Sequence, residues 1–151
     1  MDVKITPSKI YGEITAPPSK SYAHRLLIAS FLSGEQVCVK NAGTSDDVLA
    51  TAFALKSLGA EITVGNGSVT IVRTTVPNKV TVDCKESGST LRFLLPVAAA
   101  LGINATFTGQ GRLLSRPISG LVAALNASGA DIVGLTVNGK LSAGNTKCPQ
   151  T

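Results

Sequence analysis

The sequence predicts an α/β protein built from two copies of one βαβαββ unit. Apolar stretches with helical spacing alternate with short apolar strands along the chain. Residues 58–62 read Leu-Gly-Ala-Glu-Ile, and residues 128–132 read Ser-Gly-Ala-Asp-Ile, at an offset of 70 (58 to 128). An Asn-Gly pair, a strong signal for a hairpin turn, follows each segment, at 66–67 and at 138–139. Recurrence of a pattern at a long period indicates a repeated structural unit.

Length and composition are those of one folded domain. The chain has 151 residues, of which 44% are hydrophobic and 15% charged, and this balance excludes an intrinsically disordered protein. The longest apolar run, 93–101, is much shorter than the ~18 residues of a membrane span, so we expect no membrane association. Residues 1–14 lack the pattern of a secretory signal, which predicts a cytoplasmic location.

The titratable residues argue against several kinds of site. Cys38, Cys84 and Cys148 are odd in number and widely spaced, which predicts free thiols rather than disulfides or a zinc site. With one histidine and no acidic cluster, we expect no metal. The net charge of +5 indicates anionic partners, and the low aromatic content of 4% favours small anions over nucleic acid.

The first unit is predicted to occupy residues 20–76. Its first helix follows the stiff Pro17-Pro18 entry and ends at Gly34, and its second helix begins among capping and acidic side chains at 44–47. The expected elements are a helix over 22–32, a strand over 36–39, a helix from 44 to 58, and strands over 60–64 and 68–73.

The second unit is predicted over residues 77–141. Its last helix is expected to begin at Pro117, a favoured first helical residue, and its closing hairpin to turn at Asn138-Gly139. The expected elements are a strand over 79–83, a helix over 89–101, a strand over 104–108, a helix over 117–127 and a strand over 131–137.

Three predicted helix starts carry an arginine, namely Arg25, Arg92 and Arg116. A cation at this end opposes the helix dipole unless an anion binds there, and backbone N–H groups with nearby hydroxyls favour such an anion. Three such starts indicate a ligand set with several negative charges. The alternative for each arginine is a solvated side chain without a ligand.

Three further side chains have two interpretations each. Lys20, between two serines, is the best candidate for a compact charge on a phosphate, or else an exposed loop lysine. His24 lacks an acidic or nucleophilic partner at a suitable spacing, so we interpret it as a helix-surface histidine rather than a general base. Glu86 is predicted to hold a hydroxyl or an arginine of the site, or to be a solvated loop acid.

Two glycine patterns are not nucleotide-binding motifs. Residues 134–140 spell G-x-x-x-x-G-K, but Leu141 replaces the required hydroxyl residue. Gly109-Gln110-Gly111 lacks the third glycine of a dinucleotide fingerprint.

Four ordered motifs resemble the 5-enolpyruvylshikimate-3-phosphate (EPSP) synthase family, the enolpyruvyl transferases of the shikimate pathway. They are Pro-Pro-Ser-Lys-Ser-Tyr-Ala-His-Arg at 17–25, Ser-Asp-Asp-Val at 45–48, Ser-Gly-Ser-Thr-Leu-Arg at 87–92, and Gly-Gln-Gly-Arg to Arg-Pro-Ile at 109–118. The resemblance implies two domains, each of three βαβαββ units with helices inside and sheets outside. This inside-out α/β barrel is expected to be incomplete here, with residues 1–19 as a strand segment that joins the other domain and 142–151 as a polar tail at a truncation point.

The resemblance also implies a substrate site. Lys20, Ser21 and Arg25 would bind shikimate 3-phosphate, with Lys20 also reaching phosphoenolpyruvate. Gly88 would let backbone approach phosphoenolpyruvate, Arg116 would bind its charged groups, and Arg92 is expected nearby. The family's reaction adds the 5-hydroxyl of shikimate 3-phosphate to C2 of phosphoenolpyruvate and then eliminates phosphate. No metal or organic cofactor and no catalytic acid or base within this chain is implied.

Glu86, where many members have Asn, and Phe93, where some have Pro, depart from the family pattern. The chain alone is expected to be inactive and to self-associate, whereas the full enzyme is expected to be a monomer. Two alternatives remain open: a UDP-N-acetylglucosamine enolpyruvyl transferase fragment, disfavoured by Ser21 and a loop without cysteine, and a non-catalytic module that binds anions or nucleic acid.

Overall fold

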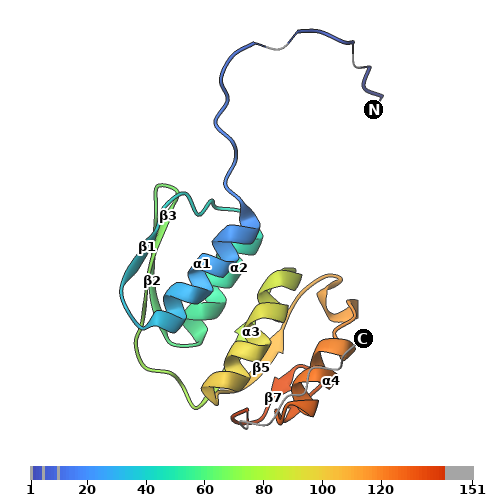
Figure 1. The fold of residues 1–151 in the computed structure, drawn as a ribbon. Coiled ribbons are helices and arrows are strands. Elements are labelled where there is room, and N and C mark those ends of the chain that lie inside the picture. The colour runs from blue at the N-terminus through green and yellow to red at the C-terminus, as the bar shows by residue number, and fades with distance from the viewer. Residues whose placement is uncertain (1, 5, 10, 142–151) are drawn as a thin grey trace.

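The computed structural model describes residues 2–4, 6–9 and 11–141 and contains helices and strands in alternation (Figure 1). The helices are α1 (Lys20–Ser33), α2 (Asp46–Ser57), α3 (Gly88–Leu101) and α4 (Ser119–Ala127), with a short 3₁₀ helix η1 (Leu113–Ser115). The strands are β1 (Val37–Val39), β2 (Ala60–Gly65), β3 (Ser68–Arg73), β4 (Lys79–Asp83), β5 (Asn104–Thr108), β6 (Ile132–Val133) and β7 (Thr136–Val137). The predicted α/β class is confirmed.

Two sheets follow one another along the chain and share a strand order. The first has the order β1-β3-β2 with antiparallel pairs throughout. The second has the order β4-β5-β7-β6, in which β4 runs parallel to β5 and the remaining pairs are antiparallel. The strands β5, β7 and β6 therefore correspond in order and direction to β1, β3 and β2.

Serine caps and left-handed glycines mark the ends of α1 and α3. The Ser19 side chain accepts a hydrogen bond from the Tyr22 amide at 3.4 Å, and the Ser87 side chain accepts one from the Thr90 amide at 3.2 Å. Gly34 and Gly102 end the two helices with positive φ angles of 79° and 74°, a conformation that glycine adopts without steric cost.

The core lies between α1, α2 and α3 and the inner faces of the sheets. Each of these three helices buries a face, and they contact one another, as their side-by-side placement in Figure 1 shows. Leu27, Phe31, Leu55 and Leu94 are completely buried at these contacts. By contrast, none of the 9 residues of α4, all of which the structure describes, is buried.

The last hairpin turns earlier than predicted. β6 pairs with β7 through Ile132 opposite Val137, so the turn lies at Gly134-Leu135 and the predicted turn at Asn138-Gly139 is wrong. The Asn138 amide donates to the Asp131 carbonyl at 2.8 Å. Asn138 therefore continues the pairing outward from the turn instead of reversing the chain.

α4 also begins later than predicted, at Ser119 and not at Pro117. The first backbone hydrogen bond of this turn runs from the Val122 amide to the Ile118 carbonyl at 3.0 Å. The Pro117 carbonyl instead accepts a hydrogen bond from Arg92 Nη2 at 3.0 Å. The Pro117 carbonyl thus accepts from a side chain of α3 and is not part of the backbone hydrogen bonding of α4.

The segment before α1 runs away from the helices as an extended, exposed chain (Figure 1). Its described residues, 2–4, 6–9 and 11–19, contain no strand, so the strand segment at 1–19 and the unit boundaries at 20–76 and 77–141 stay predictions. The predicted polar tail at 142–151 lies outside the described residues, as does Cys148. Within the described part of the chain, Cys38 and Cys84 are free thiols, and no helix is long and apolar enough to cross a membrane.

Candidate functional site

The amino-terminal ends of α1, α2 and α3 lie together and carry most of the predicted site residues. Lys20 Nζ at the start of α1 forms an ion pair with Asp47 Oδ2 of α2 at 2.6 Å. The side chain of Ser87, the cap of α3, also helps to lower the pKa of the Asp47 carboxyl. These contacts join the starts of three helices, where exposed backbone N–H groups and helix dipoles favour negative charge.

Two arginines converge on the first residue of α3. A Cβ atom added to Gly88 would lie 2.8 Å from Arg92 Nη1 and 2.9 Å from Arg116 Nη1. Arg92 comes from the next turn of α3, and Arg116 follows η1 directly. The two guanidinium groups therefore share the space beside a buried glycine at a helix start. Because like charges repel, an anion placed between them would lower their energy.

The expectation of three separate arginine-bearing helix starts is wrong in one part. Arg116 belongs to no helix start of its own, since α4 begins three residues later, and its guanidinium reaches the start of α3 instead. Arg92 and Arg116 thus form one site rather than two. This arrangement concentrates more positive charge at Gly88 than the sequence alone predicts.

Arg25 lies one turn along α1 and faces α3. Its Nη1 donates to the Ser21 carbonyl at 2.9 Å, and its guanidinium carbon lies 5.3 Å from the centroid of the Phe93 ring. A guanidinium at this distance over an aromatic ring gains a cation–π attraction. Phe93 belongs to α3, so this attraction lies at the contact between α1 and α3. Ser21 and Arg25 are exposed.

Lys20 and Asp47 form a charge pair that is open to solvent on one side. Their side chains are 54% and 34% exposed. The hydrogen bond from Lys20 is the largest influence on Asp47 and holds the pKa of its carboxyl below the ordinary value of 3.8. Asp47 therefore stays ionised at neutral pH, and Lys20 keeps two of its three donors for a ligand.

His24 is buried, and its interpretation as a helix-surface histidine is wrong. Only 1% of the residue is exposed, and its Nδ1 lies 2.7 Å from Thr51 Oγ1. Burial lowers the pKa of His24 below 6.5 as the main cause; Asp47 acts in the opposite direction, and Lys20 and Arg25 reinforce the lowering. The partner on α2 lies 27 residues away, which is why spacing along α1 gave no signal for it.

Glu86 packs against the 109–112 loop, and within the described part of the chain its carboxylate has no hydrogen bond to a site arginine or a hydroxyl. A Cβ at Gly111 would collide with the Glu86 carboxylate, and a Cβ at Gly109 would lie 2.8 Å from the Lys85 carbonyl. The Gln110 amide donates to that carbonyl at 2.7 Å. The two glycines thus let this loop pack closely on the segment before α3, which brings Arg116 to Gly88.

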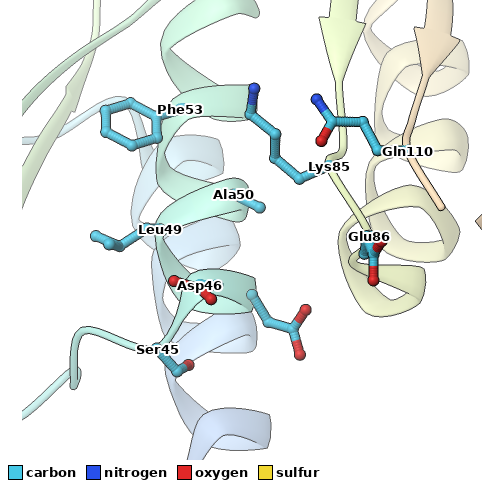
Figure 2. Close-up of a pocket in the computed structure, with 9 residues that line it drawn as sticks. Ser45, Asp46, Leu49, Ala50, Phe53, Lys85, Glu86 and Gln110 are labelled. Carbon is cyan, nitrogen blue, oxygen red and sulfur yellow. The ribbon is translucent and has the colours of Figure 1, made fainter.

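Two hollows border the site. One, of about 670 Å³, separates Lys85, Glu86 and Gln110 from the first two turns of α2, as Figure 2 shows. Asp47 lines it, but none of the six predicted site residues does. A smaller one, of about 220 Å³, is lined by Lys20, Pro17, Pro18 and the loop before α2. The predicted anion ligands thus lie at the helix starts and not in the larger hollow.

The described residues offer this site neither a reactive form of Cys84 nor a group of metal ligands. Burial raises the pKa of the Cys84 thiol to about 12, so it is an inert core residue. Among the described residues, no three histidine, cysteine or acidic side chains lie close enough to hold a metal ion.

The chain matches known proteins of one kind. The family model described as EPSP synthase (3-phosphoshikimate 1-carboxyvinyltransferase) matches residues 5–147. A 3-phosphoshikimate 1-carboxyvinyltransferase from Clostridium kluyveri is 43% identical and covers 95% of this chain, and one from Clostridium beijerinckii is 40% identical and covers 97%. The matches extend over 35% and 37% of those relatives, so the chain spans about a third of their length.

A solved structure has the same fold. An EPSP synthase from Acinetobacter baumannii superposes with a TM-score of 0.76 at 22% identity, over 87% of this chain and 33% of that one. At this identity the likeness concerns the fold alone.

Proposed function

The chain belongs to the EPSP synthase family, and on this premise we propose that it forms the part of a 3-phosphoshikimate 1-carboxyvinyltransferase that binds the charged groups of both substrates. The enzyme would transfer the enolpyruvyl group of phosphoenolpyruvate to the 5-hydroxyl of shikimate 3-phosphate, on the route to chorismate and the aromatic amino acids. The family match disfavours the alternative assignment to a UDP-N-acetylglucosamine enolpyruvyl transferase.

The observation that supports this proposal most is the convergence of Arg92 and Arg116 on Gly88 at the start of α3. Phosphoenolpyruvate carries a phosphate and a carboxylate, and two planar guanidinium groups with helix N–H groups suit two such anions. Glycine leaves the space that a Cβ would fill, so the ligand and the guanidinium groups can approach the backbone. We assign Gly88, Arg92 and Arg116 to phosphoenolpyruvate.

Shikimate 3-phosphate is assigned to the adjoining start of α1. Lys20, held by Asp47, offers its remaining donors to the phosphate, and Ser21 and Arg25 are exposed beside it. Between Lys20 and Gly88 lie Asp47, which pairs with Lys20, and Ser87, which caps α3. One substrate would therefore lie on each side of that bridge, with Lys20 also within reach of phosphoenolpyruvate.

In this function the described residues bind, orient and neutralise the substrates. Placing the hydroxyl against C2 of phosphoenolpyruvate makes the addition effectively unimolecular, and the cationic groups stabilise the departing phosphate. We assign no catalytic acid or base, no metal and no organic cofactor to this chain. The units at 20–76 and 77–141 would belong to an inside-out α/β barrel of βαβαββ repeats in a monomeric cytoplasmic enzyme.

A titration tests the proposal. Phosphoenolpyruvate and shikimate 3-phosphate are added separately to ¹⁵N-labelled chain, and the amide shifts of Gly88, Ser89 and Ser21 are followed. Arg116→Ala should weaken phosphoenolpyruvate binding by about tenfold or more, as expected for one lost charge-assisted hydrogen bond, with a much smaller effect on shikimate 3-phosphate.

Arg112→Ala is the matched control, because Arg112 is an exposed arginine of the same loop and is not among the groups nearest to a Cβ at Gly88, which belong to Arg92 and Arg116. An equal loss from both variants would contradict the assignment. Tight binding of an oligonucleotide with a steep salt dependence, and none of either substrate, would instead indicate a nucleic-acid-binding module.

A further inference from the structure

A continuous chain of side-chain hydrogen bonds runs through the core between α1, α2 and α3. His24 Nδ1 lies 2.7 Å from Thr51 Oγ1, which lies 2.7 Å from Thr90 Oγ1. Thr90 Oγ1 in turn lies 2.7 Å from Ser87 Oγ. His24, Thr51, Ser87 and Thr90 are all at least 98% buried. The Ser87 side chain also lowers the pKa of the Asp47 carboxyl, so this series of hydrogen bonds ends beside the partner of Lys20.

The hydroxyl contacts fix the direction of the bonds between these side chains. Thr90 Oγ1 donates to Ser87 Oγ, and because each hydroxyl has a single proton, Thr51 must donate to Thr90 at 2.7 Å. The Asp47 backbone carbonyl, 3.3 Å from Thr51 Oγ1, is the weaker acceptor for the same proton. The remaining contact, at 2.7 Å, is then a hydrogen bond only if His24 Nδ1 carries a proton and donates to Thr51.

The other ring nitrogen of His24 agrees with this direction. Nε2 is buried and has no hydrogen-bond partner within the described part of the chain. A proton on Nε2 would be an unsatisfied buried donor, whereas a lone pair there leaves the ring neutral with Nδ1 protonated. The ring packs edge-on against Phe93, with the centroids 6.4 Å apart.

We propose that His24 is a positioning residue for Lys20: its Nδ1–H group starts a one-way hydrogen-bond chain through Thr51, Thr90 and Ser87 that fixes the Asp47 carboxylate against the lysine. Lys20 has a long, flexible side chain, and a fixed partner restricts it before a phosphate binds. The same chain ties together the three helix starts that form the site. The role for Lys20 rests on the proposed function, but the direction of the hydrogen bonds from His24 to Ser87 does not.

The direction can be tested on the unmodified chain. His24 is its single histidine, so a long-range ¹H–¹⁵N NMR spectrum contains one imidazole pattern that needs no assignment by mutation. The expected result at neutral pH is a neutral ring protonated at Nδ1, because the tautomer follows the hydrogen bond that the ring makes. A neutral ring protonated at Nε2, or a charged ring, would overturn the proposal.

The positioning role is tested with three variants. His24→Asn keeps a donor where Nδ1 stands, His24→Leu removes it, and Thr51→Val interrupts the chain with little change of shape. Thr106→Val is the matched control, since it removes a threonine pair with Thr136 that lies exposed on the second sheet. The readouts are the affinity for shikimate 3-phosphate and, without ligand, the titration of the Asp47 carboxyl carbon.

We expect His24→Leu and Thr51→Val to bind shikimate 3-phosphate about three- to tenfold more weakly, in line with one hydrogen bond, and to titrate Asp47 at a higher pH. His24→Asn and Thr106→Val should match the parent chain in both. If all four variants behave alike, the positioning role is wrong. If the parent chain fails to bind shikimate 3-phosphate, the proposed function fails, while the tautomer and the Asp47 titration still decide the hydrogen-bond chain.

Discussion

The first sheet with its helices, residues 20–73, and the second, residues 79–137, share the order of three antiparallel strands but differ in how deeply their helices are buried. α1 and α2 both bury a face in the first region. In the second region only α3 does so, and α4 has no buried residue although seven of its nine residues are Gly, Ala, Leu or Val. Similar local sequence patterns thus form similar strands, while burial depends on what packs against the helix.

The candidate site lies where these two regions meet. The first supplies Lys20, Arg25 and Asp47, and the second supplies Gly88, Arg92 and the other contacts of α3. α3 contacts both α1 and α2, so the second region completes the helix cluster of the first. Neither region by itself brings positive charge and helix N–H groups from three helix starts together.

The largest expected difference between the regions concerns stability. Leu27→Ala should lower the free energy of unfolding by about 2–5 kcal/mol, because Leu27 is completely buried in the first region. Leu125→Ala, in α4, should cost about 1 kcal/mol or less, since Leu125 is only partly buried. Urea unfolding of both variants measures this, and equal losses would show that α4 belongs to the core after all.

A smaller effect is expected at Gly59, which ends α2 in the first region. Its φ is +100°, and a Cβ there would lie 2.2 Å from the Thr75 carbonyl oxygen, so Gly59→Ala should cost about 2–4 kcal/mol. Gly67, with φ +71° and open space around it, is the matched control and should cost about 1 kcal/mol. Similar losses in thermal or urea unfolding would mean that backbone strain, and not collision, dominates at Gly59.

The corresponding residue of the second region, Gly129, also has a left-handed φ, of 92°. This agreement shows which part of the fold the sequence could predict. Glycine ends, serine caps and strand alternation act over a few residues, and most of the predicted helices and strands are confirmed to within a few residues. The strand expected over 131–137 is wrong, because this segment forms the two short strands β6 and β7. The prediction of a hairpin turn at 138–139 was wrong because an Asn-Gly pair can also lie next to a turn. The hydrogen bond from the Asn138 amide to the Asp131 carbonyl pairs these two residues, so the turn lies between them.

The site was predictable as a set of residues but not as a geometry. Motif likeness identified Lys20, Gly88 and Arg116, whose contacts now agree with an anion site. The convergence of Arg116 on α3 and the burial of His24 depend on packing between segments tens of residues apart, which no spacing along the chain encodes. Their predicted roles toward the two substrates stay predictions.

Gly88→Ala should affect binding and leave the fold intact. The atoms that a new Cβ would meet are the ends of two flexible arginine side chains, which can move away, so the free energy of unfolding should change by about 0.5 kcal/mol or less. The moved guanidinium groups would bind phosphoenolpyruvate about threefold to tenfold more weakly, in line with one impaired hydrogen bond. Calorimetric titration and urea unfolding check both parts, and unchanged affinity would contradict the site at Gly88.

The smallest expected effect is a pH dependence of stability that belongs to His24. Burial lowers its pKa in the folded chain below the ordinary value of 6.5, so the unfolded chain takes up a proton at a higher pH than the folded chain does. Stability is therefore fully present above pH 6.5 and is lost as the pH falls from there toward the lowered pKa of the folded state. The lowered carboxyl pKa values of Asp47 and Asp83 act in a separate window, with stability lost only as the pH falls below their ordinary value of 3.8.

Because the chain has one histidine, a single substitution isolates this contribution. Urea unfolding at about pH 7.5 and about pH 5.5 should show a loss for the parent chain and a clearly smaller one for His24→Asn, which cannot titrate. Thr51→Val should keep the loss, since burial and not the hydrogen bond is the main cause of the lowered pKa. Equal losses in the parent chain and His24→Asn would mean that His24 does not resist protonation in the fold, and its neutral state in the helix cluster would have to be abandoned.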